Sequence, residues 1–171
     1  MHAFGRRVFS ASLVLLAFLA QTSHSADTQD MPDKPVLTIT GAIDTTNSED
    51  RFVFSMAMLE QLPQYSFTTA TPWYPEAHKF SGPLLRDILS RVGADGETLT
   101  AIALNDYKVT IPLADSTEFN MIVALLRDDK KMPIRDKGPL FILYPFDNDS
   151  ETQSQIYYDR SIWQLKALHI E

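Results

Sequence analysis

Short runs of β-branched and apolar residues, each closed by a turn signal, recur along this chain and limit the folds open to it. Residues 36–40 alternate in this way and are followed by Gly41. Residues 99–104 and 107–111 flank Asn105-Asp106, a pair that tolerates the positive φ of a tight hairpin turn. These patterns predict strands that pair with their neighbours through short turns.

Further runs of the same kind extend the predicted sheets. They cover residues 51–54, 65–71, 121–126, 140–144 and 162–170. In the last run the apolar positions change parity between Trp163/Leu165 and Leu168/Ile170, which indicates a β-bulge. The charged residues 127–131 predict a tight loop.

The best-defined helix is predicted at residues 84–92. Gly82 lies near its N-cap, Pro83 takes the first helical position, and Gly93 follows its last turn. Its apolar residues form one stripe at helical spacing: Leu84, Leu85, Ile88, Leu89 and Val92.

A shorter helix is predicted at residues 56–62, with Ser55 as its N-cap and Pro63 as its stop. Seven or eight short strands with two or three short helices give an α+β fold that is mainly β. We expect one domain at residues 35–171, after a disordered lead-in at 26–34 that is polar, with Pro32 inside it and Pro35 directly after it.

Residues 1–25 have the pattern of an export signal. Arg6 and Arg7 precede an apolar segment at 8–20 that is too short to span a bilayer. Ser23 and Ser25 are small residues that suit cleavage after Ser25, and cleavage after Ala26 is nearly as suitable. The apolar core favours Sec export, although the paired arginines also resemble a twin-arginine signal. The predicted location is the periplasm, with no membrane span after cleavage.

Charge and cysteine content exclude several functions. Removal of residues 1–25 takes away two arginines and no acid, so 13 basic residues face 22 acidic ones and the net charge is −9. This balance argues against nucleic acid and anionic membranes as partners. The chain has no cysteine, which excludes thiolate catalysis and thiolate metal ligands.

Residues 67–93 hold the densest set of candidate functional residues. Thr68, Thr69 and Thr71 precede Trp73 and either present hydroxyls to a ligand or serve as ordinary strand residues. Trp73 either stacks on a planar ligand or covers the core. His78 lies in a predicted polar loop, where it either binds a metal or phosphate or is simply solvated.

Arg135 and Lys137, followed by Gly138, form a second candidate site. Two cations on one short loop suit an anionic group such as a cofactor phosphate, and a solvated charged loop is the alternative.

A family resemblance emerges from six segments taken in order. They read T-x-T-P-W at 69–73, F-S-G-P-L-L-R-D-I-L at 80–89, A-L-N-D-Y-K-V-T-I-P at 103–112, R-D-K-G-P-L at 135–140, Y-P-F at 144–146 and S-I-W-Q-L at 161–165. Together they resemble the molybdopterin-binding domain of sulfite-oxidase-like oxidoreductases, in a short exported form. The resemblance covers residues 36–171 and implies a mainly β fold around a molybdenum–pterin cofactor.

Catalytic members of that family hold the metal through a cysteine that lies shortly before the helix corresponding to residues 84–92. Here the same place offers Thr68, Thr69 and Thr71. The resemblance therefore implies a non-catalytic ligand-binding, sensory or accessory module, with a small anionic ligand or an envelope sensor or redox protein as partner. The alternative is an active molybdenum-dependent oxidoreductase with an oxygen ligand from one of these threonines.

Overall fold

The fold is taken from a computed structural model that describes residues 34–171. The predicted signal at 1–25 and all but the last residue of the predicted lead-in lie outside the described residues. Within residues 34–171, no helix is both long enough and apolar enough to cross a membrane.

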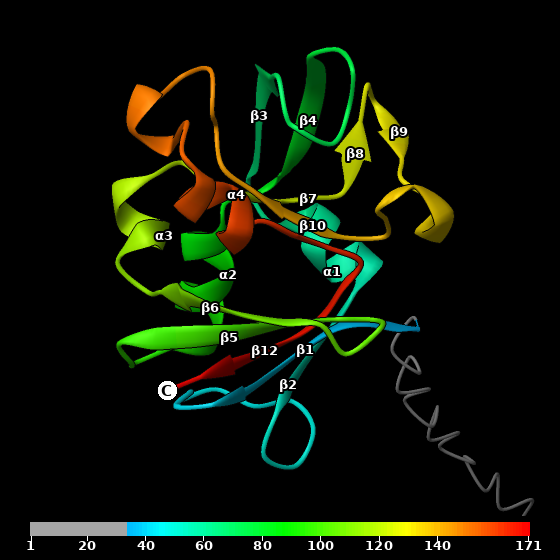
Figure 1. Cartoon of the computed structure of the whole chain (residues 1–171). Helices are drawn as coiled ribbons and strands as arrows, with labels where there is room; N and C mark the ends of the chain where they lie inside the picture. The colour runs from blue at the N-terminus through cyan, green and yellow to red at the C-terminus, as the bar shows by residue number, and fades with distance from the viewer. Residues whose placement is uncertain (1–33) are drawn as a thin grey trace, which may run out of the picture.

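A five-stranded sheet forms the lower layer of the molecule in Figure 1. Its order is β2-β1-β12-β5-β6. The strands are β1 (Pro35–Gly41), β2 (Phe52–Ser55), β5 (Thr98–Ala103), β6 (Lys108–Pro112) and β12 (Leu165–Ile170). β1 and β12 pair in parallel and the other neighbours are antiparallel. The first and last strands of the described chain therefore lie side by side at the centre of this sheet.

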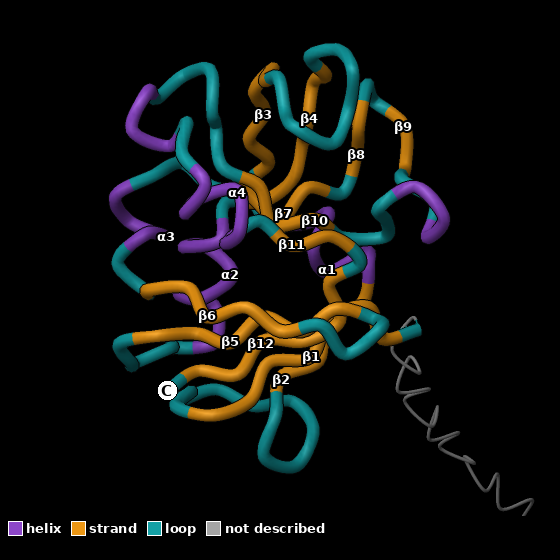
Figure 2. Tube along the Cα trace, in the orientation of Figure 1, coloured by secondary structure: helices purple, strands orange, loops and turns teal. Residues whose placement is uncertain are grey.

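Two smaller sheets lie above it, and Figure 2 shows all three in one colour. One has the order β11-β10-β7 and the other β3-β4-β8-β9. Their strands are β3 (Gln64–Thr69), β4 (His78–Pro83), β7 (Ile122–Ala124), β8 (Leu126–Arg127), β9 (Lys130–Lys131), β10 (Phe141–Leu143) and β11 (Ile162–Trp163). Every residue of β7 and β10 is buried, so these two strands form the centre of the core.

Short helices fill the space around the sheets. They are α1 (Met56–Gln61), α2 (Leu85–Val92), α3 (Asp115–Glu118) and α4 (Gln155–Arg160), with 3-10 turns η1 (Ile134–Asp136) and η2 (Ser150–Thr152). Figure 1 shows α2, α3 and α4 grouped on one side above the five-stranded sheet. α2 buries Leu85, Ile88, Leu89 and Val92, which confirms the predicted stripe except at half-buried Leu84.

Several predictions from local sequence are confirmed. The fold is α+β and mainly β. The hydroxyl of Ser55 accepts a hydrogen bond from the backbone N–H of Met58 at the start of α1. Gly93 ends α2 with φ 61°, a conformation that glycine adopts without a Cβ clash. β5 and β6 form the predicted hairpin, and Asp106 in its turn has φ 65°.

The start of the second helix was predicted wrongly. Gly82 and Pro83 belong to β4, and α2 begins at Leu85 with Leu84 as its N-cap. β4 was missed because it contains one large apolar residue, Phe80, and because its last two residues are the pair that often precedes a helix. His78 is accordingly the first residue of a strand and does not lie in a loop.

Two other predictions are refined. Residues 127–131 contain the tight turn of a hairpin between β8 and β9, where Asp128 and Asp129 have φ 50° and 60°. The run 162–170 is two strands in different sheets, separated by Gln164 with φ 53°. The predicted irregularity is present as a register shift between Leu165 and Ala167. The change of sheet at Gln164 alters the chain path more than this shift does.

Gly82 lets two sheets approach closely. A Cβ on Gly82 would lie 2.0 Å from the carbonyl oxygen of Val123 and 2.9 Å from Cα of Ala124, both in β7. Backbone atoms cannot yield as a flexible side chain can, so any larger residue must push β4 away from β7.

We therefore predict that Gly82→Ala lowers the free energy of unfolding by about 3 kcal/mol, the upper end of the usual cost of overpacking. Urea denaturation followed by circular dichroism measures it. Ser81→Ala in the same strand is the control and should change stability by less than about 0.5 kcal/mol. Equal stabilities for the two variants would contradict the close packing of β4 on β7.

Candidate functional site

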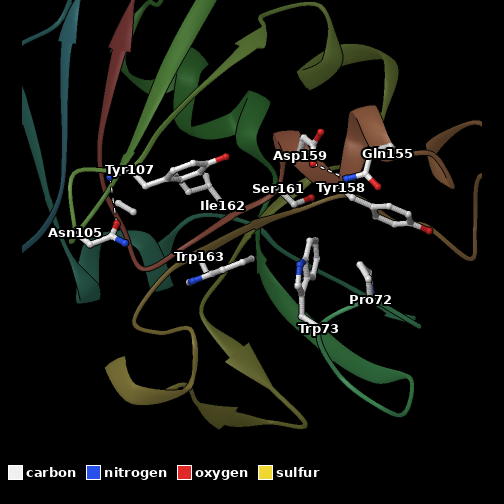
Figure 3. A pocket seen from close by; sticks show the side chains of 11 residues that line it. Pro72, Trp73, Asn105, Tyr107, Gln155, Tyr158, Asp159, Ser161, Ile162 and Trp163 are labelled. Atoms are coloured by element: carbon white, nitrogen blue, oxygen red, sulfur yellow. Dashed lines mark hydrogen bonds between the residues drawn. The ribbon is translucent and has the colours of Figure 1, made fainter.

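A pocket of about 490 Å³ opens where four distant segments meet. The segments are the turn after β3, the end of β5 with its turn, α4, and the stretch 161–163 containing β11 (Figure 3). Its lining residues are Pro72, Trp73, Ala103, Asn105, Tyr107, Gln155, Tyr158, Asp159, Ser161, Ile162 and Trp163. The volume lies within the range of about 300–1,000 Å³ that is usual for small-molecule sites.

Aromatic rings supply most of the apolar wall. The ring of Trp73 packs edge-to-face against Trp163, with centroids 5.5 Å apart, and against Tyr158 at 6.2 Å. On its core side Trp73 contacts Phe141 at 5.5 Å and Phe146 at 6.2 Å. Trp73 therefore covers the core, one of the two roles expected for it, and also lines the pocket; its stacking on a planar ligand stays a prediction.

The polar lining is made of amides, hydroxyls and one carboxylate. The side-chain oxygen of Asn105 accepts a hydrogen bond from the backbone N–H of Tyr107 at 3.2 Å and fixes the turn. The amide nitrogen of Gln155 donates to Asp159 at 2.6 Å. Ser161 is buried, and its hydroxyl donates to the carbonyl of Tyr157 at 3.0 Å.

α4 owes its position to a buried polar network. The carboxylate of Asp115 in α3 is 4% exposed. Its Oδ2 accepts hydrogen bonds from the hydroxyl of Tyr144 at 2.6 Å and from Arg160 at 2.8 Å. Burial, followed by the hydrogen bond to Asp115, raises the pKa of Tyr144, so the phenol stays a donor. Because Arg160 ends α4, this network fixes the helix that carries Gln155, Tyr158 and Asp159.

Of the seven residues singled out from the sequence, the pocket lining includes Trp73 alone. Thr68 is exposed. Thr69 is fully buried, and its hydroxyl accepts from the N–H of Asp147 at 3.0 Å and donates to the carbonyl of Ala70 at 3.2 Å. The hydroxyl of Thr71 is buried without a hydrogen-bond partner among residues 34–171. The three threonine hydroxyls therefore do not line one cavity.

His78, Arg135 and Lys137 lie outside the pocket lining as well. His78 bonds through Nδ1 to Asp128 Oδ2 at 2.7 Å. Arg135 is exposed in η1. Lys137 places its Nζ 4.6 Å from the ring centroid of Tyr74 and 5.5 Å from that of Trp163. These distances are within the range of cation–π contacts, so the ammonium group of Lys137 packs on both rings.

A polar cluster around Tyr74 was not expected from the sequence. Arg127 makes two hydrogen bonds to Asp136, at 2.6 and 3.1 Å, and its guanidinium lies 4.3 Å from the ring centroid of Tyr74. The hydrogen bonds from Arg127 lower the pKa of Asp136, and burial raises the pKa of Tyr74 to about 12. The charges are mutually satisfied, so this cluster holds η1 against β8.

The pocket lining does not fit a molybdenum–pterin group. It contains no lysine, arginine, histidine or cysteine, so it offers no cation for a phosphate and no soft ligand for the metal. Elsewhere in residues 34–171, no group of three or more His, Cys, Asp or Glu side chains is placed to hold a metal ion.

Comparison with known proteins adds no assignment. No family model matches the chain, and no curated protein matches it significantly.

The buried network predicts a stability effect at the site. Arg160→Met should lower the free energy of unfolding by about 3 kcal/mol, because it leaves the Asp115 carboxylate buried without its cation. Urea denaturation at pH 7 measures this loss. In the Arg160→Met background, Asp115→Asn should recover part of it because the uncompensated charge is gone. Wild-type stability of Arg160→Met would contradict the role given to the ion pair.

Proposed function

We propose that this protein is a non-catalytic small-ligand-binding module on a fold of the sulfite-oxidase-like molybdopterin-binding type. We further propose that it acts in the periplasm after export, as a sensory or accessory protein for an envelope partner. The ordered family segments and the signal-like residues 1–25 support the fold type and the location. The observation that carries the binding function is the 490 Å³ pocket walled by both tryptophans of the chain.

The chemistry of the lining supports binding over catalysis. The hydroxyl of Ser161 donates to a backbone carbonyl, and no histidine lines the pocket to act as its base. Asp159 is the single carboxylate, is exposed, and is hydrogen-bonded to Gln155. Such a lining can orient a ligand, but it lacks the paired groups of acid–base or nucleophilic catalysis.

The alternative oxidoreductase needs a threonine oxygen beside its cofactor. None of Thr68, Thr69 and Thr71 lines the pocket, and the hydroxyl of Thr69 is already bonded at both its donor and an acceptor position. The hydroxyl of Thr71 is buried without a hydrogen-bond partner among residues 34–171, but no group of three or more His, Cys, Asp or Glu side chains in those residues could complete a metal site beside it. A binding module is therefore the function that the geometry supports better.

Tyr107 provides the sharpest test because it lines the pocket and is 55% exposed, so its removal leaves the core intact. We predict that ligand-observed NMR with a library of small neutral, cationic and anionic compounds finds ligands that compete for one site. Tyr107→Ala should weaken their binding about tenfold, or about 1.4 kcal/mol, through loss of the aromatic contact.

Tyr65→Ala is the matched control, because Tyr65 is an exposed aromatic residue of β3 that is not part of the lining. It should leave the same affinities unchanged. A library without ligands, or ligands that respond equally to both substitutions, would contradict binding in this pocket.

A further inference from the structure

The charge of the pocket limits what it can hold. Its lining has no cationic side chain, and its one carboxylate is at the exposed rim. Three cations close to lining residues contact other groups: Lys137 lies over the rings of Tyr74 and Trp163, Arg160 is paired with Asp115, and Lys166 with Asp106. A phosphate or carboxylate ligand would find no counter-ion among the lining side chains, so the chemistry of the lining favours an uncharged ligand.

The orientation of the rings limits the ligand's shape. Trp73 meets Trp163 at 65° and Tyr158 at 85°, in direct edge contact. A flat heteroaromatic ligand is held best between two parallel rings, and neither of these wall contacts provides such a slot. The contacts also leave no space between the rings for the closed aromatic box that surrounds a quaternary ammonium ion.

The hydrogen-bonding groups are mixed in kind and stand at the edges of the aromatic wall. The amide nitrogen of Asn105, the amide oxygen of Gln155, and the hydroxyls of Tyr107 and Tyr158 have no hydrogen-bond partner among residues 34–171. Asp159 keeps its second oxygen as a further acceptor. Donors and acceptors set around apolar faces suit a ligand whose groups both donate and accept, as hydroxyls do.

We propose that the ligand is a short neutral oligosaccharide, an inference that rests on the binding function proposed above. Each sugar ring has an apolar C–H face that packs on an aromatic ring and an edge of hydroxyls that bonds to amides and carboxylates. Figure 3 shows Tyr107 on one side of Trp163, and Trp73 and Tyr158 on the other. The aromatic residues therefore extend across the pocket, so that more than one sugar ring contacts them.

The intrinsic tryptophan fluorescence of the protein can report this binding. Trp73 and Trp163 are its only two tryptophans, and both line the pocket. A sugar that covers either ring must change the intrinsic fluorescence. No added label is needed, and unrelated tryptophans contribute no background.

The test begins with an array of neutral and anionic glycans and continues with fluorescence titration of the purified protein by the neutral glycans that bind. Calorimetry measures the binding of choline, pterin-6-carboxylate and inorganic phosphate, which represent the competing ligand classes. We expect saturable binding of at least one neutral glycan, little dependence on salt, and no binding of phosphate. Tyr107→Ala should weaken glycan binding about tenfold, and Tyr65→Ala should not change it.

The possible results distinguish the carbohydrate proposal from the more general proposal that the pocket binds a small ligand. Binding of pterin-6-carboxylate, choline or an anionic glycan at the tryptophans, with no neutral glycan bound, would overturn the carbohydrate assignment and leave the binding function standing. Failure of every probe here, together with failure of the small-molecule library, would overturn both. Neutral glycan binding that Tyr107→Ala does not weaken would place the sugar outside this pocket.

Discussion

The buried carboxylate of Asp115 is the constraint on which the functional side of this molecule depends. A charge in that position must be neutralised and fully hydrogen-bonded, because an unpaired buried carboxylate is costly. Tyr144 reaches it from the strand side of the core and Arg160 from the end of α4. A helix of six residues is too short to be stable alone, so this anchor determines where α4 lies. The position of α4 in turn places Gln155, Tyr158 and Asp159 in the pocket lining.

The aromatic wall depends on a second constraint, the change of sheet at Gln164. The chain leaves the β11-β10-β7 sheet there and enters the centre of the five-stranded sheet as β12. Trp163 is thereby left half-exposed beside Trp73, while Leu165 is fully buried on the other side of the break. Trp73 in turn packs on Phe141 of the buried strand β10. The wall is therefore an outward continuation of the core, which makes it rigid enough to preorganise a site.

Features set by adjacent residues were predictable from the sequence, as the Ser55 cap, the Gly93 terminus and the Asn105-Asp106 hairpin show. β4 was not, because the partners that make its polar residues acceptable are distant: His78, for example, bonds to Asp128. The set of residues that lines the pocket was not predictable, since it comes from four segments that only the tertiary fold brings together. The family resemblance directed attention to threonines and cations outside the pocket lining: Thr69 and Lys137 make internal contacts, whereas Thr68 and Arg135 are exposed.

We propose that this fold binds its ligand through an aromatic pocket and carries no metal-bearing cofactor. The most direct measurement is the molybdenum and pterin content of the protein isolated from the cells that make it, by elemental analysis and by fluorescence of the released pterin. The lining of the pocket and the absence of cysteine predict neither component above background. One molybdenum atom per chain, recovered together with a fluorescent pterin, would contradict ligand binding without a cofactor.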